Sequence, residues 1–370
     1  MTDSHEAALV LEDGSVFVGR PFGARTEVVA EVVFNTGMTG YEEVVSDPSY
    51  RGQMVVMTHP QIGNYGFAAA RTESARPWVE ALVVREVALR PHHWEASGGL
   101  GEHLAQWGIP GIEGIDTRAL VRRLRGTGTQ LATVRQSGPD GFGSVELARL
   151  AGSLDAGPPA RKDVVAAVSG WAPTGGDSNV TVLDLGLKWG IVRSLERRGI
   201  GARVVRWDTS AEAILEMDPR AIVVSNGPGD PAALPTVVET VRALSRSGIP
   251  LLGICLGHQL LGLAAGATTS RLRYGHHGGN HPVRDTRTGI VTITTQNHEF
   301  QVDRDSVAST SGLDVSHASL NDGSVEGLRH RAWPVWSVQF HPEGGPGPRD
   351  GETVFDDLLA VAGITARKAA

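Results

Sequence analysis

The stretch Gly253-Ile-Cys-Leu-Gly-His-Gln259 decides the fold of the part of the chain in which it lies. An apolar run, Pro250 to Ile254, leads into it and is typical of a buried β-strand, and a helix begins at once with Leu260 and Leu261. The same alternation starts at Val180, where apolar strands are separated by predicted helices over 188–198, 211–217 and 234–245. It predicts an α/β domain with a mostly parallel sheet flanked by helices.

Outside this region the pattern changes twice. Residues 1–151 combine short strands, including a hairpin around Asp13-Gly14, with a helix that starts after Asp116 and ends at Gly126, which predicts a smaller α+β domain. Residues 152–176 are rich in Pro, Gly and Ser and are predicted to be a linker. The α/β domain then covers residues 177–370; it turns β-rich after Gly266 and closes with a helix over 353–361.

Composition excludes several classes of protein. The 370 residues carry 34 basic and 41 acidic side chains, and the net charge of −7 argues against a nucleic-acid or anionic-membrane partner. No run of 18 apolar residues suggests a membrane span, and the first residues lack the basic segment of a signal peptide. A single cysteine, Cys255, cannot form a disulfide framework, so we expect a cytoplasmic protein.

Cys255 lies where the strand meets the helix, between Gly253 and Gly257. This is the pattern of a nucleophile elbow, in which glycines relieve crowding around a strained nucleophile. The helix N-terminus favours a thiolate, and the amide of Leu256 is placed to stabilise an oxyanion. A lone cysteine is more often a buried, unreactive thiol. The two glycines and the strand-to-helix context favour the nucleophile.

A base for this nucleophile is predicted in Trp336-Ser-Val-Gln-Phe-His-Pro-Glu343. A strand delivers His341 at its end, Pro342 stops the strand, and Glu343 is placed to fix the imidazole tautomer. The alternative is an ordinary His-Pro-Glu turn at the surface. With Cys255, the stretch predicts thiolate attack on an acyl carbon, proton donation by His341 to the leaving group, and hydrolysis of a thioester.

A further loop, Ser225-Asn-Gly-Pro-Gly-Asp-Pro231, follows another buried strand. Its glycines, Gly227 and Gly229, permit a tight turn with exposed amides, which suits a second oxyanion donor, although an ordinary loop between strand and helix has the same composition.

These three motifs, in this order and spacing, resemble the class I, triad-type glutamine amidotransferase domain over residues 177–370. The resemblance implies that glutamine is the substrate and that Cys255, His341 and Glu343 form the triad. It also implies an oxyanion hole made by the amides of Leu256 and Gly227, and the release of ammonia to a partner site.

Other motifs resemble the small-subunit family of carbamoyl-phosphate synthetase: Phe34–Tyr41, Ser46–Tyr50, Ile62–Asn64, Gly114–Arg118, Tyr274–Pro282 and Gln296–His298. This resemblance implies a large-subunit partner that binds ATP, Mg²⁺ and bicarbonate and makes carbamoyl phosphate for arginine and pyrimidine synthesis. It implies no cofactor and no metal in this chain. It makes His298 an accessory active-site histidine, and the residues expected to contact glutamine are Ser49, Gly227, Gly229, Leu256, Gln259, Asn297, Glu299 and Phe300.

Glu299 departs from the family's pattern, which usually has glycine at this place. A carboxylate near the carboxylate of glutamine is unfavourable if it is buried, and costs little if it points outward. We therefore expect weakened glutamine binding, and a lower KM for glutamine when Glu299 is replaced by glycine.

Three alternatives remain at this point. The histidines of Tyr274–His281 suggest a metal cluster, but this stretch offers no cysteine or acidic ligand, so a glycine-rich structural loop is favoured. The second alternative is a subunit that binds a partner without hydrolysing glutamine. The third is the glutaminase component of another synthase, such as anthranilate synthase, and the amino-terminal 150 residues argue against it. No glycine-rich phosphate-binding motif is present, so we expect ATP to bind elsewhere.

Overall fold

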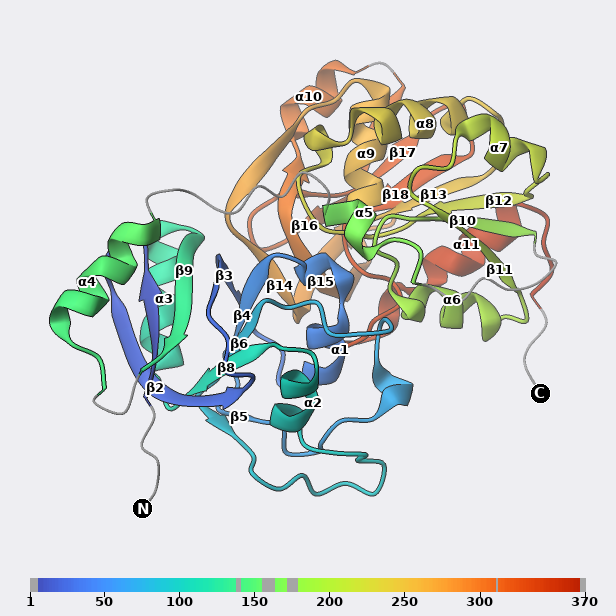
Figure 1. The fold of residues 1–370 in the computed structure, drawn as a ribbon. Helices are drawn as coiled ribbons and strands as arrows, with labels where there is room; N and C mark the ends of the chain where they lie inside the picture. The colour runs from blue at the N-terminus through green and yellow to red at the C-terminus, as the bar shows by residue number, and fades with distance from the viewer. Residues whose placement is uncertain (1–5, 138–140, 155–163, 172–178, 311, 367–370) are drawn as a thin grey trace. The chain divides into compact units, whose positions relative to one another are not determined.

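The computed structural model describes residues 6–137, 141–154, 164–171, 179–310 and 312–366. They form two compact units, a barrel unit of residues 6–72 and 76–154 and a sheet unit of residues 73–75 and 164–366 (Figure 1). Of the predicted linker, residues 155–163 and 172–176 lie outside the described residues. Between them a short helix, α5 (Val164–Val168), packs Val165 into the core of the sheet unit.

The barrel unit is built on a closed barrel with the strand order β1-β2-β8-β6-β4-β3-β9. The predicted hairpin is present, with Ala8 opposite Val18. Its barrel strands are β1 (Ala7–Leu11), β2 (Val16–Gly23), β3 (Val28–Asn35), β4 (Gln53–Met57), β6 (Ala81–Val83), β8 (Pro110–Glu113) and β9 (Gln130–Gln136), and β5 (Gln61–Ile62) pairs with β7 (Glu86–Val87) beside them. The α+β class is as predicted, whereas closure of the strands into a barrel was not predicted.

In the described residues of this unit, the barrel is accompanied by α1 (Tyr41–Ser46), α2 (Leu100–Gln106), α3 (Thr117–Thr127) and α4 (Ser144–Ser153). The Asp116 side chain caps α3 by accepting a hydrogen bond from the amide of Ala119 at 2.9 Å. The predicted stop at Gly126 is wrong by one residue, because Gly126 stays helical and the chain leaves the helix at Gly128, whose φ is +102°.

The sheet unit contains a nine-stranded sheet with the order β11-β10-β12-β13-β18-β17-β16-β14-β15. The neighbours from β11 to β18 are parallel, and those from β18 to β15 are antiparallel. The strands are β10 (Val180–Asp184), β11 (Ala202–Arg206), β12 (Ala221–Val224), β13 (Leu251–Ile254), β14 (Thr269–Asp285), β15 (Val291–Val302), β16 (Leu313–Ser319), β17 (Val325–His330) and β18 (Val335–Val338).

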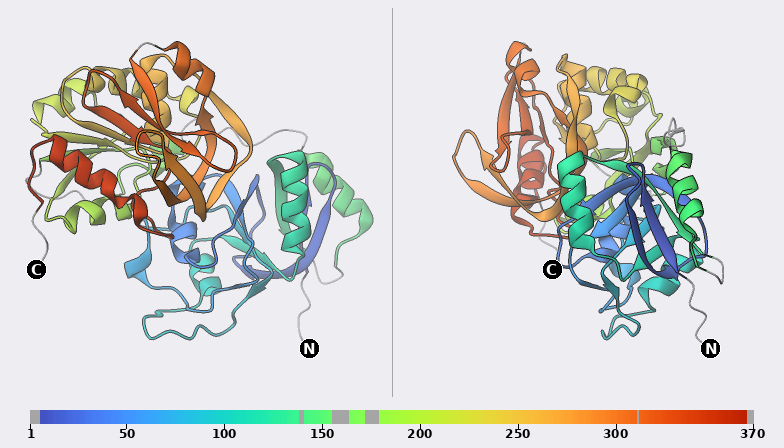
Figure 2. Two further views of the ribbon diagram at one scale, coloured as in Figure 1. Left: turned by 180° about the vertical axis from the view of Figure 1, so that it is seen from behind. Right: turned by 90° about the vertical axis from the view of Figure 1, so that its left-hand side faces the viewer.

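Helices cover both faces of the parallel part, as the alternating pattern predicts. The apolar side chains of α6 (Trp189–Glu196) and α11 (Thr353–Val361) pack on one face, where α11 is the red helix in Figure 2. Those of α7 (Ala211–Glu216), α8 (Pro235–Ser245) and α9 (Leu256–Ala265) pack on the other. A short helix, α10 (Arg304–Ser309), follows β15. This two-sided burial explains why the parallel strands read as continuous apolar runs.

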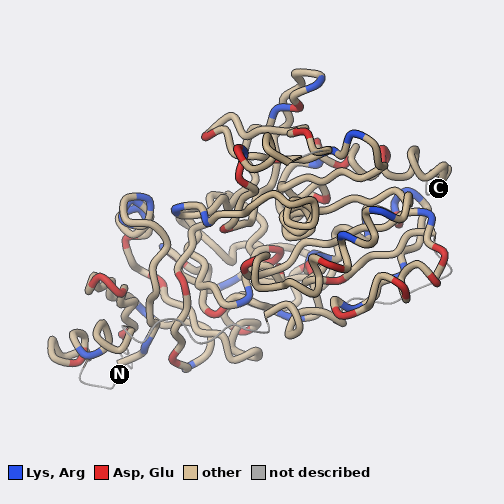
Figure 3. The backbone as a smooth tube through the Cα atoms, turned by 90° about the horizontal axis from the view of Figure 1, so that it is seen from above, with Lys and Arg blue, Asp and Glu red and all other residues tan. Residues whose placement is uncertain are grey.

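Basic and acidic residues alternate along the described parts of both units, where blue and red segments of the backbone are interspersed (Figure 3). Among the described residues, no helix has both the length and the apolar character needed to cross a membrane.

Candidate active site

Cys255 occupies a strained turn between β13 and α9. Its φ of 53° and ψ of −103° lie in a region that residues with side chains rarely adopt. The side chain is buried, and its Sγ donates toward the carbonyl of Asn297 at 3.5 Å. The strand-to-helix elbow predicted around this cysteine is therefore present, and the strain is confined to the one residue that carries the thiol.

The two glycines beside Cys255 allow the backbone segments to approach closely. A Cβ on Gly257 would lie 2.2 Å from the carbonyl oxygen of Val224, and one on Gly253 would lie 2.6 Å from the carbonyl oxygen of Gly257. Neither distance is tolerable for a carbon atom, so α9 starts against the end of β12 only because these side chains are absent.

His341 reaches the neighbourhood of Cys255 because β13 and β18 are adjacent in the sheet. Ile254 pairs with Val338 in parallel register, and the amide of Cys255 donates to the carbonyl of Val338 at 2.9 Å. Three residues further on, the amide of His341 donates to the carbonyl of Thr295 in β15 at 2.8 Å, so both strands fix its backbone. Strand pairing thus joins two residues that are 86 positions apart.

The imidazole of His341 is oriented by Glu343. His341 Nδ1 lies 2.7 Å from Glu343 Oε1, and both side chains are fully buried. Burial alone would lower the pKa of His341, but the charge of Glu343, helped by Cys255, raises it. The other ring nitrogen, Nε2, has no hydrogen-bond partner among the described residues. This imidazole therefore holds a proton on the side of Glu343 and has Nε2 available for chemistry.

A buried lysine that the sequence did not reveal neutralises Glu343. Lys188 Nζ lies 2.9 Å from Glu343 Oε1 and donates to the carbonyl of Gly345 at 2.7 Å, and its side chain is 1% exposed. Although burial raises the pKa of Glu343, Lys188 and His341 together lower it below its ordinary value. Lys188 precedes α6, where the sequence pattern gives no sign that a charged residue is buried.

Glu73 is a second residue that the sequence pattern missed. Its carboxylate accepts from the amide of Gly190 at 2.8 Å and pairs with Arg193 at 2.6 Å, and its own carbonyl accepts from the amide of Trp189. A Cβ on Gly190 would lie 2.9 Å from both Glu73 Oε2 and Glu343 Cγ, so the two carboxyl groups flank the start of α6. The segment Glu73–Ala75 belongs to the sheet unit although the residues that flank it in sequence, Thr72 and Arg76, belong to the barrel unit.

The loop after β12 lies beside the elbow. A Cβ on Gly227 would lie 2.1 Å from the carbonyl oxygen of Leu185 and 2.9 Å from Leu256 Cδ2, and Gly229 has a φ of +92°. Asn226 fixes the loop by accepting from the amide of Lys188 and donating to the carbonyl of Gly186. The two predicted oxyanion donors, Gly227 and Leu256, are therefore neighbours.

Strand β15 brings the other predicted glutamine contacts to the same region. The Gln259 side chain donates to the carbonyl of Phe300 at 2.8 Å, and Asn297 meets Cys255 through its carbonyl. His298 donates from Nδ1 to the carbonyl of Phe300 at 2.8 Å, and burial lowers its pKa well below the usual value. Neutral and held by a backbone carbonyl, His298 is not suited to replace His341 as the base.

Glu299 is buried yet paired. Its Oε1 lies 2.9 Å from His277 Nε2 and its Oε2 lies 3.1 Å from Arg271 Nη2. Burial raises the pKa of this carboxyl, but the contacts with His277 and Arg271 outweigh burial and lower it. The carboxylate is therefore buried, which is the case for which weakened glutamine binding was predicted, but it is paired with His277 and Arg271. Its effect on glutamine binding stays a prediction.

Ser49 belongs to the barrel unit, whereas the other predicted site residues belong to the sheet unit. It is buried in a short 3₁₀ helix over Pro48–Tyr50, and its amide donates to the Asp47 side chain at 2.9 Å. Tyr50 in turn accepts from the Asn35 side chain. The motifs of residues 34–50 thus build one hydrogen-bonded corner of that unit.

The histidines of the 274–281 stretch do have acidic neighbours, supplied from further along the chain. His276 Nε2 lies 2.8 Å from Asp322, and its Nδ1 lies 3.7 Å from Glu326, which with His298 places three possible ligand atoms within 4.8 Å of one another. Burial would lower the pKa of His276, but these carboxylates raise it to about 9. The acidic partners that the stretch itself lacks are therefore supplied by Asp322 and Glu326, and they pair with His276.

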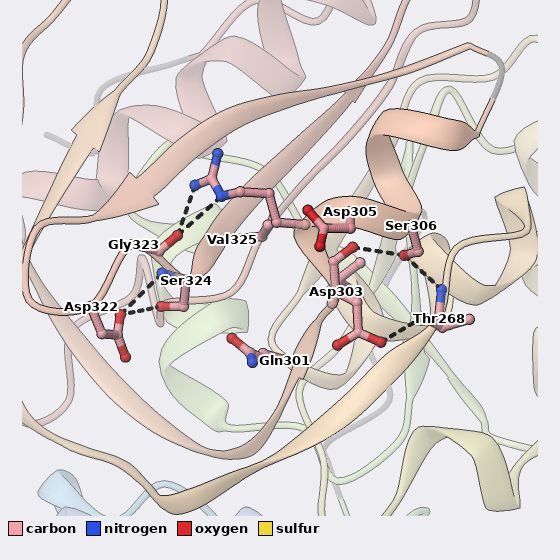
Figure 4. A pocket seen from close by; sticks show the side chains of 11 residues that line it. Thr268, Gln301, Asp303, Asp305, Ser306, Asp322, Gly323, Ser324 and Val325 are labelled. Carbon is pink, nitrogen blue, oxygen red and sulfur yellow. Dashed lines mark hydrogen bonds between the residues drawn. The ribbon is translucent and has the colours of Figure 1, made fainter.

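A polar pocket of about 540 Å³ is lined by residues of β15, α10 and the turn before β17 (Figure 4). Two of its carboxylates have partners within the protein: Asp303 accepts from Thr268 and Ser270, and Asp322 accepts from Ser324 as well as contacting His276. Asp322 thus links the lining of this pocket to the histidines.

Comparisons with known proteins agree for both parts of the chain. Residues 9–134 match the family model "Carbamoyl-phosphate synthase small chain, CPSase domain", and residues 181–361 match "Glutamine amidotransferase class-I". The carbamoyl phosphate synthase small chain of Symbiobacterium thermophilum is 46% identical over 367 residues, which cover 96% of this chain and 98% of the relative. That of Bacillus caldolyticus is 45% identical, covering 95% of each. The carbamoyl phosphate synthase pyrimidine-specific small chain of Bacillus subtilis is 41% identical, covering 97% of each.

Proposed function

Because this chain belongs to the carbamoyl phosphate synthase small-chain family and carries a class I glutamine amidotransferase domain, we propose that it hydrolyses L-glutamine to glutamate and ammonia at Cys255. The observation that carries the proposal is the strained elbow of Cys255 next to His341, whose imidazole is held by the buried carboxylate of Glu343. A strained nucleophile, a base and a group that orients the base are the parts that acyl transfer requires.

In the first half of the reaction, the Cys255 thiolate attacks the side-chain amide carbon of glutamine. The carbonyl oxygen becomes an oxyanion that accepts hydrogen bonds from the amides of Leu256 and Gly227. His341 then donates its Nε2 proton to the amide nitrogen, the carbon–nitrogen bond breaks, and ammonia leaves behind a thioester.

In the second half, water attacks the thioester. His341 accepts a proton from the water, a second oxyanion forms in the same place, and the carbon–sulfur bond breaks to release glutamate and restore the thiolate–imidazolium pair. Glu343 and Lys188 hold the ring in one tautomer throughout. The remaining contacts to glutamine are assigned to Ser49, Gly229, Gln259, Asn297, Glu299 and Phe300, with His298 beside them.

The ammonia is proposed to pass to a carbamoyl-phosphate synthetase large subunit. That partner binds ATP, Mg²⁺ and bicarbonate and makes carbamoyl phosphate for arginine and pyrimidine synthesis. We place the reaction in the cytoplasm, since a catalytic thiolate must stay reduced.

The decisive experiment compares wild type with Cys255→Ser, each mixed with a carbamoyl-phosphate synthetase large subunit and supplied with glutamine or with ammonia. We expect the variant to lose glutamine-dependent carbamoyl phosphate formation by about 10³-fold or more and to keep the ammonia-dependent reaction. A subunit that only binds its partner would be indifferent to the change. If wild type hydrolysed glutamine but never supported carbamoyl phosphate formation, the assignment of the active site would stand and the assignment of the partner would be refuted.

A further inference from the structure

Glu299 and His277 meet in a niche that a bulge in β14 creates. The pairing of β14 with β15 shifts register between Arg271 and His276, and Gly275, within the shift, has a φ of +68°. A Cβ on Gly275 would lie 2.5 Å from His277 Nε2 and 2.6 Å from Glu299 Oε1. The carboxylate and the imidazole therefore meet at the space that the absent side chain leaves.

From this niche a chain of contacts runs to the nucleophile. Arg271, which is partly exposed, pairs with Glu299, and Glu299 contacts His277 Nε2. His277 Nδ1 lies 2.9 Å from Asn297 Oδ1, and the carbonyl of Asn297 meets Cys255 Sγ. Glu299, His277 and Asn297 are all buried, so water does not compete for these contacts.

The chemistry of the acceptor fixes one proton in this chain of contacts. The carboxylate of Glu299 can only accept hydrogen bonds, so His277 Nε2 donates to Glu299 Oε1, and the ring is held between this contact and the side chain of Asn297. Without the carboxylate, Nε2 loses this acceptor, and the ring is free to turn or to move its proton to Nδ1. Either change alters the contact that Nδ1 makes with the Asn297 side chain.

We propose that Glu299 is a positioning residue for glutamine binding in this chain: through His277 it holds the Asn297 side chain in one orientation. The inference rests on the proposed function, in which Asn297 contacts glutamine. It reverses the expectation from sequence, because loss of the carboxylate should now weaken glutamine binding and not strengthen it.

The other charged groups around His277 do not supply a substitute for Glu299. Burial lowers the pKa of His281 to about 4, and that of His298 is also lowered, so both rings are neutral. His276 is positively charged and is held by Asp322 and Glu326, and Arg271 faces the opposite carboxylate oxygen. Glu299 contacts this ring directly, with its Oε1 at 2.9 Å from His277 Nε2.

The test compares Glu299→Gln, His277→Gln and the double variant, with Glu239→Gln as a control at an exposed glutamate of α8. For Glu299→Gln we expect the KM for glutamine to rise about 10-fold, as for loss of one charge-assisted hydrogen bond, with kcat within about 2-fold of wild type. In the His277→Gln background, the same change should have no further effect on KM.

A second readout does not depend on activity. With ¹⁵N-labelled histidine, Nε2 of His277, assigned by its loss in His277→Gln, should carry the proton that it donates to Glu299 in wild type, and its signal should shift in Glu299→Gln. An unchanged or lower KM, an equal rise in KM in both backgrounds, or an Nε2 without a proton in wild type would each overturn the proposal. If wild type failed to hydrolyse glutamine, the proposed function would fall while the nitrogen signals still decided whether His277 donates to Glu299.

Discussion

Both units bury a glutamate completely, but the two carboxyl groups have opposite charge behaviour. Glu343 of the sheet unit lies 2.9 Å from Lys188 and 2.7 Å from His341, and its pKa is lowered despite burial. Glu42 of the barrel unit has its nearest cation, Arg71, at 3.4 Å, and burial raises its pKa to about 7. At Glu343 the charges of Lys188 and His341 outweigh burial, whereas at Glu42 burial outweighs the charge of Arg71.

The glycines of the two units differ in a similar way. Gly257 is required by space, since a Cβ there would lie 2.2 Å from a backbone oxygen. Gly14, in the hairpin of the barrel unit, has a φ of +82° but no atom within 4 Å of the position of a Cβ. One glycine serves close packing at the active site, and the other serves only the local turn.

The largest effect is expected from Lys188→Met, which would make the surroundings of Glu343 similar to those of Glu42. Removing one partner of a buried ion pair leaves an uncompensated charge, so the free energy of unfolding should fall by about 3–5 kcal/mol in urea denaturation at pH 7.5. Arg206→Met is the control, because its ion pair with Asp208 is exposed, and it should cost less than about 0.5 kcal/mol. Equal effects of the two variants would contradict the comparison.

Next in size is Gly257→Ala, set against Gly14→Ala. Forcing a methyl group against the carbonyl of Val224 should destabilise the chain by about 3 kcal/mol and abolish glutamine hydrolysis, because the elbow must move. Gly14→Ala should cost about 1 kcal/mol, the strain of a positive φ alone, and leave hydrolysis unchanged. Thermal melting and a glutaminase assay check both, and an active Gly257→Ala enzyme would contradict the account of the elbow.

The smallest effect is expected from Glu42→Gln. Because the pKa of Glu42 in the folded chain, about 7, is above its ordinary value of 4.5, its protonated form favours folding. That contribution is fully present below pH 4.5 and is lost as the pH rises through 7. The variant should therefore lose less stability than wild type between pH 5 and pH 8, and be more stable by about 1–2 kcal/mol at pH 8.

Glu73 limits how flat this profile can become. Burial raises its pKa to about 7 as well, so part of the pH dependence should persist in Glu42→Gln. The exposed Glu239→Gln should leave the slope of the melting temperature against pH unchanged. A slope in Glu42→Gln as steep as that of wild type would show that Glu42 is ionised in the folded chain.

Local patterns predicted much of the fold. The apolar strands, the cap of α3 at Asp116 and the helix over 353–361 could be read from periodicity and end signals, because these depend on neighbours in sequence. Barrel closure depends on which strands meet at the ends of the sheet, and α5 is helical because Val165 reaches a core that the sequence does not display. Barrel closure and the formation of α5 are decided by tertiary packing between residues that are distant in sequence, so local patterns could not predict them.

The candidate site divides in the same manner. Cys255 and its two glycines lie within five consecutive residues, and Glu343 follows His341 by two residues. These parts of the site could be predicted because the residues that act together are close in sequence. Lys188 and Glu73 had no such signal, because a single charged residue shows no periodicity and its burial is decided by a partner more than a hundred positions away. The partners of Glu299 were missed for another reason, since the bulge at Gly275 sets which residues of β14 face it.

The segment Glu73–Ala75 has a consequence for dissecting the protein. A fragment that starts at residue 164 would keep the whole Cys-His-Glu constellation and still be incomplete, because it would lack the carboxylate that holds Arg193 and the amide of Gly190. The first turn of α6 would lose its anchor next to Lys188. A shortened chain meant to keep glutaminase activity must therefore contain residues 73–75 as well, added as a peptide or joined to the fragment. The sheet unit is thus encoded by two separate stretches of the gene.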